Sequence, residues 1–322
     1  MTPVLFLKLL AIFVTVAIGW LAGRTKPFAG GEAARILSNA AFFVFAPALL
    51  FRATARIDLA SLPWHALGAF FVPVVGWMLV VYLQQRRLRP AHAATPATRS
   101  MTAGFGNNAQ LGIPMAAALF GEAGLQLHLS VVSLHALILL TTLTVLVEQD
   151  LARATARSSG AAVPLAQTLR STVRNTVIHP IVLPVLAGMA WNVTGLAIPG
   201  PIDEVLVMLG TAVVPLCLVA IGLSLGHYGL RGTAGSAAWL AAAKLAVQPA
   251  LVLGFGWLLG LRGLALTVIV MASAMPTGAN ALMFAQRYRT QEGETTAAIV
   301  LSTLAFAATA PAWLLLLVNL PA

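Results

Sequence analysis

Two short polar stretches interrupt a sequence that is otherwise strongly apolar, and they carry the side chains best suited to binding a solute. The first is GFGNNAQLGIP at residues 104–114, which contains two asparagines, a glutamine, three glycines and a proline. The second is MPTGAN at residues 275–280, which contributes a threonine and an asparagine. Amide and hydroxyl groups both donate and accept hydrogen bonds, so they can orient a polar solute. The two stretches are therefore candidate parts of a binding site.

Both stretches fall near the middle of segments long enough to cross a membrane, so each is expected to break a helix there. Backbone amides and carbonyls freed inside a membrane need partners, and a broken helix is tolerated only where it is buried in protein or lines a wet cavity. The N-terminal end of a half-helix presents N–H groups and partial positive charge, which suits a carboxylate. The alternative is a kink in which the asparagines only cap freed backbone groups.

The composition predicts an all-α polytopic membrane protein. Hydrophobic residues make up 59% of the chain and charged residues 9%. The first apolar block lacks the cleavage site of a signal peptide, so we expect it to be retained. Ten apolar blocks have about the length that crosses the hydrocarbon core as a helix, near residues 3–23, 34–52, 63–83, 99–120, 124–147, 173–195, 204–226, 235–259, 263–286 and 295–318.

These ten spans divide into two five-helix halves. The longest polar connection, a linker at residues 149–172, separates an N-terminal repeat at residues 1–148 from a C-terminal repeat at residues 173–322. Pairing residues 107–124 with residues 276–293 superimposes the two polar interruptions and places Ser133 on Ser302. Because each half has an odd number of spans, the second enters the membrane in the opposite sense and the repeat is inverted. Corresponding broken helices in such repeats, here spans 4 and 9, indicate a transporter's binding site near the midplane.

The distribution of basic residues predicts the orientation of the chain. The formal net charge is +10, but the basic residues lie in short loops and form no separate basic domain, so no nucleic-acid partner is expected. Most of them fall in the odd-numbered loops, whereas the even-numbered loops carry only Arg52, Arg56 and Arg262. The positive-inside rule then places both termini outside the cytoplasm and the linker inside it.

Four motifs resemble those of the auxin efflux carrier family, namely NNAQLGIPMAAALFGEAG, MPTGANALMFAQRY, FFVFAPALLF and HPIVLPVLAG. The similarity extends over essentially the whole chain, and the family includes plant auxin exporters and bacterial malonate transporters. The resemblance implies that spans 4 and 9 cross at their breaks. It further implies that spans 3–5 and 8–10 form a transport unit that slides against a scaffold of spans 1, 2, 6 and 7, usually in a homodimer. Substrates of the family are organic anions bound at the crossover.

Two departures from the plant members favour a bacterial type. Plant carriers have a proline immediately before the span 4 asparagine, where this chain has Gly106. They also often carry a long hydrophilic central loop, which the short linker of this chain does not match. The resemblance therefore implies a multi-pass protein of the bacterial inner membrane, whose termini the positive-inside rule then places in the periplasm, and the departures argue against auxin itself as the substrate.

The ionisable residues favour a carrier without a metal, a cofactor or sodium coupling. All nine acidic residues lie in loops or at span ends, so no carboxylate is expected at the middle of the membrane. His135 in span 5 is the best candidate for a titrating group near the site, and a neutral histidine bonded to a neighbouring helix is the alternative. Lys244 in span 8 would either lend positive potential to an anion site, or snorkel to an interface or pair with a carbonyl.

The residues and the resemblance together predict a secondary transporter or facilitator of small organic anions, working by elevator-type alternating access in a lipid bilayer. The alternatives are a proton-coupled carrier of another small metabolite and a small-molecule sensor built on a transporter fold. A membrane enzyme is disfavoured because no metal-binding helix, phosphate-binding loop or acid pair within the spans is present. The predicted substrate-binding residues are Asn107, Asn108, Gln110, Gly112, Pro114, Pro276, Thr277, Gly278, Asn280, His135 and Lys244.

Overall fold

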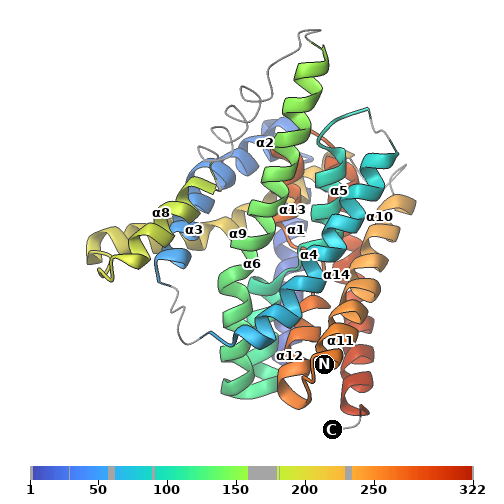
Figure 1. Ribbon diagram of the computed structural model, residues 1–322. Helices are drawn as coiled ribbons and strands as arrows, with labels where there is room; N and C mark the ends of the chain where they lie inside the picture. The colour runs from blue at the N-terminus through green and yellow to red at the C-terminus, as the bar shows by residue number, and fades with distance from the viewer. Residues whose placement is uncertain are drawn as a thin grey trace.

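The computed structural model describes residues 3–28, 30–56, 62–88, 91–158, 180, 182–228 and 234–320. Regular structure in these ranges is helical (Figure 1). The α-helices are α1 (Pro3–Ala22), α2 (Gly31–Ala40), α3 (Ala46–Ala55), α4 (Trp64–Arg87), α5 (Thr95–Gly104), α6 (Ile113–Ser158), α8 (Val182–Val193), α9 (Gly200–Tyr228), α10 (Ala234–Ala242), α11 (Gln248–Leu258), α12 (Gly263–Ser273), α13 (Asn280–Arg287) and α14 (Glu292–Val318).

Several helices have the length and composition needed to cross a membrane. Helix α4 has 24 residues and so spans roughly 36 Å, at 1.5 Å per residue, against about 30 Å of hydrocarbon. Within the described ranges, six stretches meet both criteria: Gly31–Ala55, Trp64–Arg87, Leu119–Thr155, Gly200–His227, Ala234–Leu258 and Glu292–Val318. Shorter apolar helices occupy Leu183–Val193 and Gly263–Ser273. The expectation of an all-α, multi-helix membrane protein is therefore confirmed.

Three π-helical segments widen the spans locally: η2 (Ala41–Phe45), η3 (Asn108–Gly112) and η4 (Ala243–Val247). Segment η2 joins α2 to α3, and η4 joins α10 to α11, so each pair forms one continuous span. Such segments are rare and frequently occur at functional sites. Only the irregularity at η3 was expected from the sequence, because η2 and η4 contain no glycine, proline or asparagine.

The two predicted helix breaks are both present. The first lies between the end of α5 at Gly104 and the start of α6 at Ile113, with η3 inside it. The second lies between Ser273, the last residue of α12, and Asn280, the first of α13. Helix α6 contains the predicted turn between spans 4 and 5, at Gly121, whose φ of 61° and ψ of −161° are not helical. The same helix continues to Ser158, into the predicted linker, and residues 159–172 lie outside the described ranges.

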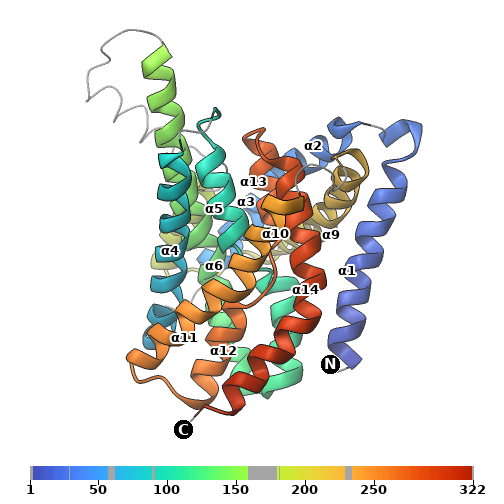
Figure 2. The same ribbon diagram turned by 90° about the vertical axis from the view of Figure 1, so that its right-hand side faces the viewer.

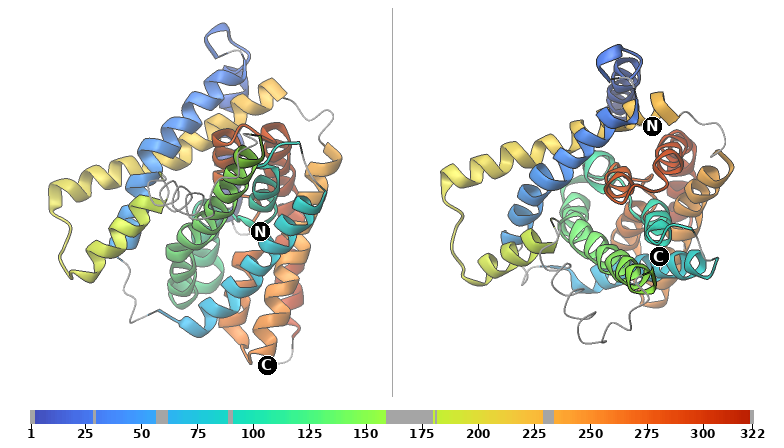
Figure 3. Two further views of the ribbon diagram at one scale, coloured as in Figure 1. Left: turned by 45° about the horizontal axis from the view of Figure 1, so that its top comes forward. Right: turned by 90° about the horizontal axis from the view of Figure 1, so that it is seen from above.

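The helices form two groups that lie side by side (Figure 3). Helices α1, α2, α3, α8 and α9 pack mainly on one another, with α9 against α1, α2 and α3. Helices α4, α5, α6 and α10–α14 form the second group, in which α5 packs on α4, α6 and α13. We call these the α9 group and the α5 group. The first and last described residues lie at one end of the molecule, and α2 and α13 lie towards the other (Figure 2).

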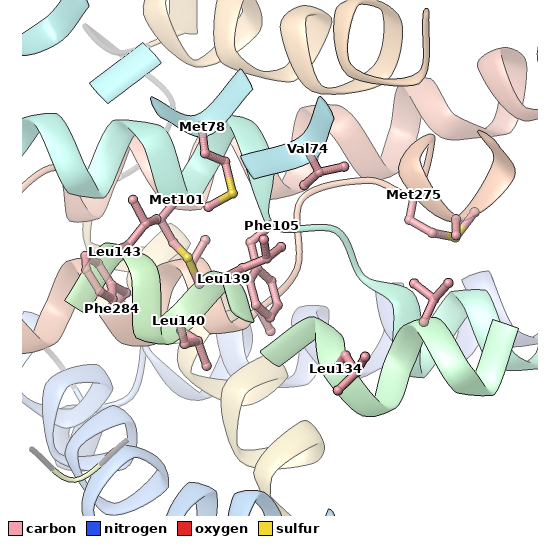
Figure 4. Packing of buried hydrophobic residues seen from close by; sticks show 14 of the residues in the cluster. Val74, Met78, Met101, Phe105, Leu134, Leu139, Leu140, Leu143, Met275 and Phe284 are labelled. Carbon is pink, nitrogen blue, oxygen red and sulfur yellow. The ribbon is translucent and has the colours of Figure 1, made fainter. Parts of the chain in front are cut away.

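The core of the α5 group surrounds the two breaks, as Figure 4 shows for Val74, Met78, Phe105 and Met275. Helix α5 is buried along most of its length although many of its residues are polar. Its hydroxyl groups have partners: Ser100 donates to the carbonyl of Met78 at 2.6 Å, and Thr102 shares a hydrogen bond with Thr295 at 3.0 Å. A polar helix is stable inside this group because its hydrogen bonds are made within the protein.

Candidate substrate-binding site

The two breaks meet and exchange backbone hydrogen bonds. Gly106 and Thr277 form an antiparallel bridge. The N–H of Asn107 donates to the carbonyl of Pro276 at 2.8 Å, and the N–H of Gly278 donates to the carbonyl of Phe105 at 2.9 Å. Each break thus satisfies backbone groups that the other helix has freed, as a buried backbone inside a membrane requires.

Side chains from neighbouring helices satisfy further backbone groups at the broken ends. The hydroxyl of Ser302 accepts from the N–H of Thr277 at 3.1 Å, and the Thr277 hydroxyl donates to the carbonyl of Thr102 at 2.9 Å. Gln248 donates from Nε2 to the carbonyl of Gly104 at 3.1 Å. Lys244, which is fully buried, donates from Nζ to the carbonyl of Ser273 at 2.5 Å. Side chains of α14, η4 and α11 therefore bind the two breaks, and the Thr277 side chain binds one broken helix from the other.

Close approach at the bridge requires glycine. A Cβ on Gly278 would lie 3.1 Å from Cδ1 of Phe105 and 3.2 Å from the carbonyl oxygen of Gly106. A Cβ on Gly106 would lie 3.0 Å from Nδ2 of Asn108 and 3.3 Å from Nζ of Lys244. Such distances are shorter than ordinary van der Waals contacts. The two broken segments can approach this closely because neither glycine has a side chain.

A cavity of about 170 Å³ lies against the crossover. The two breaks contribute its three asparagines, Asn107, Asn108 and Asn280, which form its polar end, and most of its other lining residues are apolar side chains of α3, α6 and α9. The lining residues are Leu49, Leu50, Ala53, Thr54, Phe105, Gly106, Asn107, Asn108, Ala109, Val132, Ser133, His135, Ala136, Leu137, Val214, Gly278, Ala279 and Asn280. We call it the crossover cavity. It brings together five of the residues predicted from the sequence: Asn107, Asn108, His135, Gly278 and Asn280.

Asn108 and His135 form the most buried polar contact of the crossover cavity. Nδ2 of Asn108 lies 3.1 Å from Nε2 of His135, and the His135 ring packs edge-on against Phe105 with ring centroids 4.4 Å apart. Both side chains are at most 4% exposed. His135 is therefore bonded to a neighbouring helical segment, as the alternative interpretation expected, and it also lies in the cavity wall.

A second cavity, of about 230 Å³, lies on another side of the crossover. It shares Asn107 and Ala279 with the crossover cavity, and its remaining lining comes from α1, α9 and α14, including Trp20, Leu218 and Thr303. The crossover thus separates two cavities that differ in polarity, one with a cluster of amides and a histidine, the other largely aliphatic.

Other predicted site residues lie around the cavity but are not part of its lining. Thr277 forms the bridge with Gly106, and the Pro276 carbonyl accepts from Asn107. Lys244 binds a carbonyl at the end of α12, and Gly112 faces His128. For Lys244 this is the carbonyl-pairing alternative expected from the sequence. The side chains of Gln110 and Pro114 lie outside the described residues, although both positions are helical.

The sequence did not indicate several partners of the breaks. His128, Gln248 and Thr102 contact the broken segments through hydrogen bonds made between distant helices. For Ser302 there was one indication in the sequence, since Ser302 is paired with Ser133 when the two halves are aligned. Ser133 lines the crossover cavity, whereas Ser302 supports the second break from α14.

Comparison with known families shows the family to which the chain belongs. The model of a family described as "Membrane transport protein" matches residues 4–314. The chain belongs to the membrane transport protein family. This membrane transport protein is also 25% identical over 306 residues to an uncharacterized transporter of Methanothermobacter thermautotrophicus strain Delta H, covering 94% of this chain and 95% of the relative. The family expected from the sequence motifs is confirmed, and the chain is a multi-pass membrane transporter.

Proposed function

We propose that this transporter carries small organic anions and binds them in the crossover cavity. The observation that carries the proposal is the convergence of two half-helix starts, at Asn108 and Asn280, on one cavity lined by amides. Helix N-termini stabilise negative charge, and amide N–H groups can orient a carboxylate. Among the described lining residues there is no carboxylate to repel an anion.

The apolar walls of the crossover cavity would hold the carbon skeleton of the substrate. Leu49, Leu137 and Val214 lie on helices that face the crossover from different directions. A carboxylate at the amide end would then leave its hydrocarbon part against these side chains, as in many ligand sites with an apolar wall and a few polar groups. Small carboxylates such as malonate or an auxin-like acid are the substrates to test.

The proposed mechanism is elevator-type alternating access. Ten spans in two inverted five-helix repeats would place spans 3–5 and 8–10, the α5 group, in a transport unit that slides against a scaffold of spans 1, 2, 6 and 7. The separation of the helices into two packed groups supports this division. The position of Asn107 between two cavities supports a site that is approached along different routes in different states.

We further propose a homodimer in the bacterial inner membrane, with periplasmic termini and a cytoplasmic linker. The first and last described residues lie at the same end of the molecule (Figure 2), which supports placing both termini on one side of the membrane. The excess of arginine in the odd-numbered loops supports their assignment to the cytoplasm.

The test is electrical current from proteoliposomes on a solid support, challenged with malonate, other small carboxylates and indole-3-acetate. Sodium and pH are held equal on both sides. A current that saturates with one anion is expected, and Asn107→Ala should abolish it while the protein stays folded. A saturable current that survives unchanged in Asn107→Ala would show that the site lies elsewhere.

One observation favours a second candidate, a proton-coupled carrier. His135 is an ionisable side chain in the wall of the crossover cavity and contacts Asn108 directly. Under that mechanism an imposed pH gradient alone would drive accumulation of the substrate, and His135→Gln would uncouple the two. Equal uptake with and without the gradient would reject it.

A further inference from the structure

Two histidines on one helix contact Asn108, one at its backbone carbonyl and the other at its side-chain nitrogen. His128 and His135 are seven residues apart on α6, which is about two helical turns, so they lie on the same face. Nε2 of His128 lies 2.9 Å from the backbone oxygen of Asn108, and Nε2 of His135 lies 3.1 Å from its side-chain Nδ2. Asn108, which lines the cavity, is therefore held by a helix that also lines it.

The surroundings of His128 define its role in this pair. Its side chain is fully buried, and its Nδ1 has no hydrogen-bond partner within the described ranges. Since a carbonyl oxygen can only accept, Nε2 must carry the proton and donate it. A buried ring with one unpaired nitrogen is best accommodated as the neutral tautomer with hydrogen on Nε2.

Gly112 gives His128 the space it needs. A Cβ on Gly112 would lie 2.4 Å from Nε2 and 2.6 Å from Cε1 of His128. Any side chain at this position would displace the ring from the Asn108 carbonyl. Gly112, predicted from the sequence as a substrate-binding residue, therefore bears on the site through the position of His128.

We propose that His128 is a positioning residue for substrate binding, acting through Asn108. It is not among the residues that line the crossover cavity. It fixes the backbone of η3, the π-helical turn that begins at Asn108. With the backbone held by His128 and the amide held by His135, the polar end of the cavity is organised before the substrate arrives, which favours binding. This inference rests on the proposed function.

The test compares four variants of the full-length protein in the same current assay. His128→Met removes the donor and puts an apolar side chain of similar bulk in its place. His128→Gln retains an N–H donor at a distance from the backbone close to that of Nε2. Gly112→Ala keeps every polar group and displaces the ring. The matched control is Thr144→Val, which removes a fully buried hydroxyl from the same helix, where that hydroxyl has no partner in the described structure.

We expect His128→Met and Gly112→Ala to raise the half-saturating substrate concentration roughly tenfold, the size expected when one buried hydrogen bond is lost. His128→Gln should restore most of the affinity, and Thr144→Val should match the unmodified protein. A purely structural role would instead lower the melting temperature and the amount of active protein without changing half-saturation.

Two outcomes would overturn the inference. One is equal half-saturation for His128→Met, Thr144→Val and the unmodified protein. The other is a loss in His128→Met that His128→Gln does not restore. If His128→Met does not fold, Gly112→Ala compared with Thr144→Val gives the same decision. Absence of a saturable current from the unmodified protein would contradict the proposed function itself, and the inference with it.

Discussion

At the scale of single residues, we expect the asparagines of the crossover cavity to bind the charged group of the substrate and its apolar side chains to contact the carbon skeleton. Asn280 is the first residue of α13 and is partly exposed at the polar end of the cavity. An acidic residue in the first turn of a helix is favourable for the helix, because it complements the partial positive charge there. The same negative charge would oppose an anionic substrate. A substitution at position 280 can therefore change substrate affinity and helix stability in opposite directions.

We predict that Asn280→Asp weakens anion binding at least about tenfold, while leaving the melting temperature unchanged or higher. Two like charges about 6 Å apart repel by roughly 3 kcal/mol at an effective dielectric constant near 20, which exceeds the 1.4 kcal/mol of a tenfold change. Half-saturation of the substrate current and thermal unfolding measure the two effects. Asn319→Asp, at the exposed end of α14, is the control with the same added charge. Unchanged or tighter anion binding in Asn280→Asp would show that position 280 does not lie near the bound anion.

At the scale of elements, the positions of the helix breaks could be predicted, but most of their partners could not. Asparagine, glycine and proline within apolar spans indicate an interruption because they free or bend the backbone inside the membrane. The partner of a freed carbonyl depends on tertiary packing, so Gln248 and His128 gave no local signal. The sequence also left the pairing of Lys244 open, because one lysine in a span fits either a cavity or a carbonyl.

Gly278→Ala tests the close approach of the two breaks. The added methyl group would press on Phe105 and on the Gly106 carbonyl, which we expect to cost about 1–3 kcal/mol of stability, as for overpacked cores. The melting temperature and the saturable current should both fall. The matched control is Gly76→Ala within α4, where an added Cβ meets no atom within 4 Å and alanine favours the helix. Equal melting temperatures for the two variants would mean that the two broken segments can move apart at the bridge without loss of stability.

At the scale of the whole molecule, polar contacts join the α9 group to the α5 group near the end that holds α2 and α13. Arg35 of α2 forms an ion pair with Glu292 of α14 at 3.2 Å. The Arg287 guanidinium lies 4.9 Å from the ring centroid of Phe43 in η2. Gln286 of α13 donates from Nε2 to the hydroxyl of Ser224 in α9 at 3.0 Å. Hydrogen bonds break when their atoms separate by about an ångström, so sliding of the two groups must break such contacts.

Cross-linking across this boundary should therefore arrest transport. In a Cys217→Ala background, Ser224→Cys with Gln286→Cys places thiols on the two groups, and a short bis-maleimide would join them by forming a thioether with each thiol. The matched pair is Thr95→Cys with Thr290→Cys, whose hydroxyls lie 3.1 Å apart within the α5 group. We expect the first cross-link to abolish the substrate current and the second to leave most of it, with cross-linking measured by mass spectrometry. If the current persists when Ser224→Cys and Gln286→Cys are fully cross-linked, the two groups do not slide past one another here, and the elevator mechanism fails for this protein.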